Sequence, residues 1–247
     1  MFHSKPQIST ELGDWILDSF EWVMQRKGSQ TWRNTTPLVR PTRDFFDVPK
    51  GEDVKTAAAI GAAIMDLLGM ENPNIRIEPL PVLPDKISHE YGKLSDVGGE
   101  YWHDADDPLI TYDPRLMRQP VLFISTLTHE LMHAHLSNVV DEMPGGDMAH
   151  ELSTDLHCIT HGFGLFQLEA AEVAGWAGYM TQPSRAFALA VFLELTETST
   201  AQALPFLSSR SAKRLKRAQK DIGRFWADDL AALKSLHKAP TNAPAWN

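Results

Sequence analysis

Two histidines and a glutamate occupy the segment from His129 to His133, which reads His-Glu-Leu-Met-His. On an α-helix, residues four apart lie about 40° apart around the axis, so both imidazoles can bind one ion. Glu130 then lies about 60° from His133, beside the ion, where a general base is needed. In a chain with 10 histidines, this pattern has a chance expectation of only roughly 0.02. The motif therefore predicts a metal site whose ligands include His129 and His133, with Glu130 as its base.

A zinc site needs a third protein ligand, and the residues after the motif narrow the choice. One known arrangement has Gly three residues and His or Asp six residues after His133. It is excluded, because these positions are Leu136 and Val139. Glu151 and Asp155 follow, four residues apart, so they share one helix face. One of the two can bind the metal, while the other accepts a ring N–H from a ligand histidine and fixes its tautomer.

The motif followed by Glu-x-x-x-Asp resembles the gluzincin metallopeptidases. This resemblance implies one zinc ion with three protein ligands, a general base, and a carboxylate that orients a ligand. In this chain the implied residues are His129, His133 and Glu151 as ligands, Glu130 as the base, and Asp155 as the orienting carboxylate.

A closer similarity is to uncharacterised bacterial proteins in which Glu-x-x-Thr-Asp-Leu is followed by Gly-Phe-Gly. These patterns are residues 151–156 and 162–164 here. The similarity covers the chain from about Asp14 to Ile222, and it implies no particular substrate.

The predicted reaction is hydrolysis of a peptide bond in a peptide or protein substrate. Zinc lowers the pKa of its bound water, Glu130 takes the proton, and the hydroxide attacks a carbonyl that the metal polarises. The donor that stabilises the oxyanion stays open among His161, Tyr179 and His103, each of which is also explained as an ordinary polar residue. The alternative is a non-catalytic zinc-containing binding or regulatory protein. Glu130 favours the enzyme, because a structural zinc site has no use for a base.

Four further residues near the motif have metal-binding or reactive side chains. His135 lies about 240° from His129 on the same helix and is therefore not expected to be a ligand. His157 and His161 are four residues apart, which would allow a second metal ion, although ordinary polar roles are favoured. Cys158 is expected to be a small core residue.

Composition limits the class of protein. The chain has 247 residues, of which 43% are hydrophobic, which suffices for a globular core. Its net charge of −9 argues against nucleic acid as a partner, since phosphate binding needs a basic surface. No apolar run approaches the roughly 18 residues that cross a bilayer. One cysteine and no signal-peptide pattern lead us to expect a cytoplasmic protein; the oligomeric state stays open.

Charge is unevenly distributed along the chain. Acidic residues predominate between Asp85 and His157, and basic residues predominate from Pro205 to Asn247. We expect these two regions to form two solvated faces of one domain. The alternative is that the acidic region forms a cleft, which would prefer cationic substrates. The basic helix face from Arg210 to Arg224 is likewise expected to be solvated, with partner binding as the alternative.

Apolar periodicity predicts an α+β fold: a mostly helical single domain, residues 1–247, with a small sheet and a zincin-like active-site helix. The tail 238–247 is expected to be mobile. A strand around Glu100–His103 could offer its edge to an extended peptide. Helices are expected over 14–25, 52–70, from Arg115 through the motif, from Asp147 to about His161, and over 182–195 and 209–226. Strands are expected over 74–78, 100–103 and 109–112, and turns or loops over 26–37 and 141–146.

Overall fold

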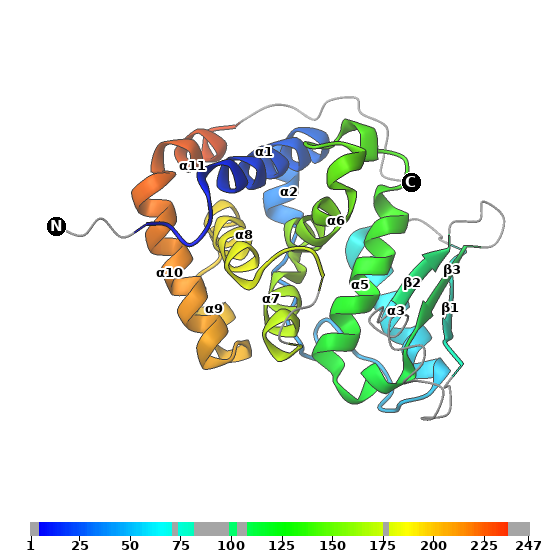
Figure 1. Cartoon of the computed structure of the whole chain (residues 1–247). Coiled ribbons are helices and arrows are strands. Elements are labelled where there is room, and N and C mark those ends of the chain that lie inside the picture. The colour runs from blue at the N-terminus through cyan, green and yellow to red at the C-terminus, as the bar shows by residue number, and fades with distance from the viewer. Residues whose placement is uncertain (1–4, 71–73, 82–98, 103–107, 175–177, 237–247) are drawn as a thin grey trace, which may run out of the picture. The chain divides into compact units, whose positions relative to one another are not determined.

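The computed structural model describes residues 5–70, 74–81, 99–102, 108–174 and 178–236. Residue contacts divide the chain into two compact units, Met1–Arg40 with Val139–Ala245, and Pro41–Asn138 with Trp246–Asn247. The mostly helical α+β fold with a small sheet is confirmed (Figure 1), whereas the single domain stays a prediction. The expected mobile tail 238–247 lies outside the described residues, as does His103.

The sheet lies in the unit Pro41–Asn138, and its described residues form three strands in the order β1-β3-β2. The expected hairpin is present, because β2 (Gly99–Trp102) pairs antiparallel with β3 (Leu109–Tyr112). The first strand, β1 (Arg76–Pro79), runs parallel to β3. It is an edge strand. The N–H that Pro79 lacks would lie on the outer side of the sheet, so no hydrogen bond of the ladder is lost.

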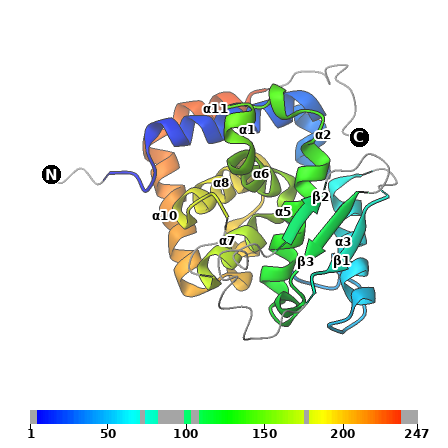
Figure 2. The ribbon, with the colours of Figure 1, turned by 45° about the vertical axis from the view of Figure 1, so that its right-hand side comes forward.

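Two helices cover one face of this sheet (Figure 2). The first, α3 (Val54–Leu68), is capped by Asp53 and ends at Gly69 in the left-handed conformation. The second, α5 (Pro120–Leu136), carries the histidine motif in its later half, as predicted. It begins at Pro120 and not at Arg115, because a 3₁₀ turn, Pro114–Arg118, capped by Asp113, comes first.

The other unit is a group of helices around α8 (Gln182–Leu195), which contacts α1, α7, α10 and α11 (Figure 1). Its buried residues include an apolar run from Ala186 to Leu193. The surrounding helices are α1 (Thr10–Lys27), α2 (Ser29–Thr35), α6 (His150–Cys158), α7 (Gly164–Val173), α9 (Thr200–Ala203), α10 (Ser209–Phe225) and α11 (Ala227–Lys234). None of the described helices has the length and apolarity needed to cross a bilayer.

Four local predictions for this unit are wrong in whole or in part. The polar segment 26–37 contains α2, whose Trp32 is fully buried. Helix α11 follows α10 almost directly, although no separate helix was expected there. Asp147 does not cap α6: it begins a 3₁₀ turn, Asp147–Ala149, and the residue preceding α6 is Ala149. The expected loop 141–146 also overlaps a 3₁₀ turn, Val140–Glu142.

A π-helical turn, Ile159–Phe163, separates α6 from α7, and Gly162 makes it possible. Gly162 has φ +95°, and a Cβ there would lie 2.1 Å from the Pro37 carbonyl oxygen. In return, the Gly162 carbonyl accepts the backbone N–H of Val39 at 3.0 Å. Pro37 and Val39 thus pack against the turn that follows α6, the helix that carries Glu151.

Replacement of Gly162 by Ala should lower the free energy of unfolding by roughly 2–4 kcal/mol, through backbone strain and the collision with Pro37. Gly223→Ala is the matched control, because Gly223 lies within α10 and a Cβ there meets nothing within 4 Å. That control should be stabilised by roughly 0.5–1 kcal/mol. Urea unfolding followed by circular dichroism measures both; equal stabilities of the two variants would contradict the role of Gly162.

Candidate metal centre

The two motif histidines face each other on one side of α5. Their Nε2 atoms are 3.1 Å apart, and the two rings are close to perpendicular, at 84°. Both residues are half-buried, whereas the neighbouring Leu131 and Met132 are fully buried. The packed side of α5 therefore fixes the helix, and one helical turn brings the two nitrogens together.

This separation fits two ligands of one ion. Two nitrogens, each about 2.0–2.1 Å from a tetrahedral zinc ion, are about 3.4 Å apart. The observed 3.1 Å between the Nε2 atoms of His129 and His133 is close to this value. Two lone pairs aimed at the same point repel unless a proton or a cation lies between them. The pair can therefore take up a metal with little movement.

Glu151 completes a group that could hold a metal. One ligand atom each from His129, His133 and Glu151 all lie within 4.8 Å of one another, and all three residues are half-buried. Glu151 lies in the first turn of α6, after the 3₁₀ turn Asp147–Ala149. Within the described residues, this is the one such group of three or more His, Cys, Asp or Glu side chains. Two imidazoles and a carboxylate form a donor set typical of zinc with an open coordination position.

Asp155 lies one turn after Glu151 and is almost fully buried, at 1% exposure. Its Oδ2 accepts a hydrogen bond from the Arg185 Nη2 at 2.7 Å, in an ion pair whose side chains are both 2% exposed. The same oxygen accepts the backbone N–H groups of Tyr179 at 2.6 Å and Met180 at 2.8 Å. Asp155 therefore anchors α6 to Tyr179 and Met180, which lie just before α8, and to Arg185 of α8 itself. Its expected role toward a ligand histidine stays a prediction.

Arg185 and Gly178 complete this anchor, and the sequence reasoning did not identify them. Gly178 has φ +77°, and a Cβ there would lie 2.4 Å from the Arg185 Nη2 and 2.7 Å from the Asp155 Oδ2. Only glycine lets the backbone approach the ion pair this closely. The sequence does indicate that Arg185 is unusual, because it is the one cation in the apolar helix 182–195. A buried cation needs a buried acidic partner.

Glu130, the predicted base, lies against the sheet. It is 8% exposed, and its Cγ lies 3.0 Å from the position that a Cβ would occupy on Gly99 of β2. The same Cβ would lie 3.1 Å from the Thr111 carbonyl oxygen and 3.1 Å from the Thr126 Cγ2. The absence of a side chain at Gly99 thus leaves room for the stem of Glu130. The sequence reasoning gave Gly99 no role in the site.

The three candidate oxyanion donors differ in accessibility. His161 is 2% exposed, and its Nδ1 lies 2.8 Å from the His157 carbonyl oxygen, to which it can donate. Tyr179 is 56% exposed, with its backbone held by Asp155. His103 lies outside the described residues. Of the two described candidates, only Tyr179 has a side chain accessible to a substrate.

The alternative of a second metal at His157 and His161 finds no third ligand in the part of the chain that the structure describes. His157 is fully buried beside Trp22, with ring centroids 5.4 Å apart. Burial, helped by the nearby charge of Lys27, lowers the pKa of His157 to about 3, so the ring is neutral. Its Nδ1 lies 3.2 Å from the Thr160 hydroxyl. His135 and Cys158 are also buried, and neither belongs to the metal-binding group.

No family model matches this chain, and no curated protein or solved structure is significantly similar to it. The resemblance to gluzincins stays a prediction that depends on the motif.

His133→Ala should abolish stoichiometric metal binding, because it removes one of two facing nitrogens. Zinc at about 100 times its dissociation constant should stabilise the wild type by about 2.7 kcal/mol, and this gain should vanish in the variant. His135→Gln, two residues further along α5, is the control. It should keep both the metal binding and the stabilisation by zinc. Metal content by mass spectrometry and thermal unfolding with and without zinc measure the effect. Full occupancy in His133→Ala would exclude this ligand assignment.

Proposed function

We propose that this protein is a zinc-dependent metallohydrolase that cleaves peptide bonds. The observation that carries the proposal is the group formed by His129, His133 and Glu151, with Glu130 on the same helix as the two histidines. Three protein ligands leave a tetrahedral ion one position for water or substrate. A structural zinc site is normally closed by four protein ligands.

When bound, zinc would supply a Lewis acid that polarises the substrate carbonyl and lowers the pKa of water. The chain itself supplies the proton transfer. The Glu130 carboxylate would accept a proton from the attacking water and then deliver it to the leaving amine. Because Glu130 is adjacent to His129 on a buried helix, its carboxylate has little freedom to leave the site.

Strand β2 offers a means of binding an extended substrate. Among the described residues, β2 pairs with β3 only, so its other edge has backbone groups available for a peptide. Glu100 and Trp102 are exposed and alternate with Gly99, which faces α5. A peptide added along this edge would be held by main-chain hydrogen bonds, largely independently of its sequence. Because Gly99 touches Glu130, a peptide on β2 would lie next to the base.

The alternative is a zinc-containing binding or regulatory protein without turnover. It would use the same three ligands but would give Glu130 no chemical role. Glu130 is buried, at 8% exposure, although glutamate is mostly an exposed residue in proteins. A base beside the metal explains a glutamate at this position, and this favours the hydrolase.

Glu130→Gln tests the base directly, since Gln keeps the size of the side chain and cannot accept the proton. We expect full zinc content with peptide cleavage reduced by roughly 10²–10⁴-fold. Cleavage of a fluorogenic peptide library by the zinc-loaded proteins measures this. Unchanged cleavage would exclude Glu130 as the base, and a wild-type protein with zinc but no cleavage would favour the binding protein. Iron in place of zinc would point to an oxygen-dependent reaction with the same ligands.

Gly99→Ala should displace Glu130 by a few tenths of an ångström, because the Thr111 carbonyl blocks retreat on the other side. Errors of about 1 Å in a catalytic group cost roughly 10²-fold, so we expect kcat to fall by about tenfold with zinc content unchanged. Gly223→Ala again serves as the control and should leave kcat unaltered. If Gly99→Ala lowered zinc content as much as kcat, the contact would be supporting the ligands and not the base.

A further inference from the structure

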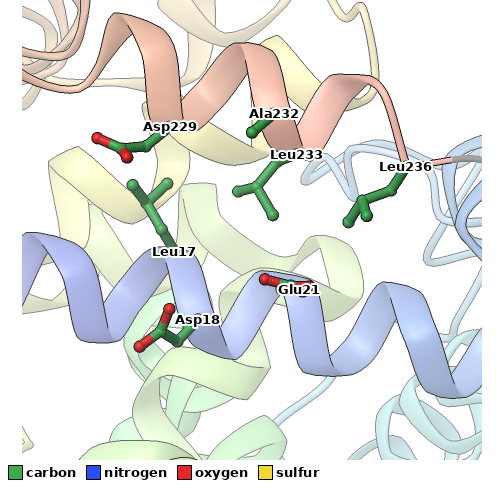
Figure 3. Close-up of a pocket in the computed structure, with 7 residues that line it drawn as sticks. All are labelled: Leu17, Asp18, Glu21, Asp229, Ala232, Leu233 and Leu236. Atoms are coloured by element: carbon green, nitrogen blue, oxygen red, sulfur yellow. The ribbon is translucent and has the colours of Figure 1, made fainter.

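A groove lies between α1 and α11, with a volume of about 190 Å³ (Figure 3). Its floor is apolar: Leu17 points from α1 toward α11, and Leu233 and Leu236 lie on the α11 side. Its rim is acidic, formed by Asp18 and Glu21 of α1 and Asp229 of α11. Ala232 completes the lining.

Helix α1 has an acidic row, Asp14, Asp18 and Glu21, which lies on one helix face within about 60°. Asp18 and Glu21 of this row line the groove. Burial and the charges of Glu21 and Asp14 raise the pKa of Asp18. In the described part of the chain, neither Asp18 nor Asp229 has an ion-pair partner. A cation placed along the row would therefore relieve repulsion between like charges.

Helix α10 has a matching lysine row, Lys213, Lys216 and Lys220, all exposed and within about 60° around the helix. Arginines beside the row are paired within the chain: Arg210 and Arg214 with Glu172, and Arg217 with Asp221. The three lysines have no such partner among the described residues. They are the exposed cations best placed to bind an external anionic surface.

The two rows match in register when the helices run antiparallel. From Glu21 back to Asp14 the intervals are three and then four residues, and from Lys213 to Lys220 they are also three and then four. At about 1.5 Å per residue, all three charges meet their opposites at once. We propose that two copies of this chain associate, with the lysine row of each copy docked along the acidic row and groove of the other.

A two-fold pair satisfies both contacts together, because each copy contributes one lysine row and one groove. The apolar stems of the lysines would cover Leu17 and Leu233 while their ammonium groups reach the carboxylates. The net charge of −9 per copy opposes association at long range. Physiological salt screens that repulsion beyond about 8 Å, while contacting pairs are screened less. The association is thus specific to these surfaces and sensitive to salt.

Charge reversal tests the pairing. One variant carries Lys213→Glu, Lys216→Glu and Lys220→Glu. The other carries Asp18→Lys, Glu21→Lys and Asp229→Lys; Asp14 is kept because its Oδ1 accepts the Trp226 indole N–H. Sedimentation velocity at about 0.05 M NaCl should give the wild type about twice the 27.6 kDa of one chain. Its dissociation constant should rise at least roughly tenfold at about 0.5 M NaCl. Each variant alone should be monomeric.

An equimolar mixture of the two variants should form a 1:1 pair, because both contacts are then again between opposite charges. Each set of three reversals changes the net charge of −9 by six units, so both variants stay negative and net charge cannot unite them. A wild type that is monomeric at about 0.1 mM, or a mixture that stays monomeric, would overturn the proposal. So would a monomer whose lysine row binds anionic phosphatidylserine vesicles, since the partner would then be a membrane surface.

Discussion

The close approach of the two α5 imidazoles is the constraint on which the candidate metal site depends. The Nε2 atoms of His129 and His133 lie 3.1 Å apart, a distance that needs a proton or a cation between the lone pairs. The separation does not depend on a flexible loop, because it is set by one turn of a helix whose other side is packed. The same helix carries Glu130, so the position of this proposed base relative to the two nitrogens is fixed by backbone geometry.

The third ligand depends on a different kind of interaction. Glu151 belongs to a short helix, α6, which Asp155 anchors through a buried ion pair with Arg185. An isolated buried pair is often no more stable than apolar residues of the same size. Here the Asp155 Oδ2 also accepts two backbone N–H groups, which replace much of the lost hydration. The pair therefore does more than add stability: it fixes one turn of α6 relative to α8, which lies in the core of the same unit.

The parts of the site that follow from local periodicity could be predicted from the sequence, and the parts that depend on close approach could not. The helical repeat alone predicted α5, its two facing histidines and the position of Glu130 beside them. It could not give Gly99, because nothing local to that residue signals that Glu130 lies above it. Asp147 was wrongly expected to cap α6, since a 3₁₀ turn shifts the helix start to His150. Helix α2 was missed because its sequence is polar apart from Trp32, which is fully buried.

The distribution of charge shows why net charge is a poor guide to the surface of this protein. A value of −9 suggests uniform repulsion, yet α10 bears three exposed lysines that have no partner in the described residues. Three arginines on the same helix, Arg210, Arg214 and Arg217, are paired with Glu172 or Asp221, whereas the lysine row is left charged. An exposed pair contributes little to stability. A row of unpaired like charges is mildly destabilising by the same reasoning, and its spacing equals that of the acidic row on α1. Binding to an acidic surface therefore explains the lysine row better than a contribution to the stability of the fold.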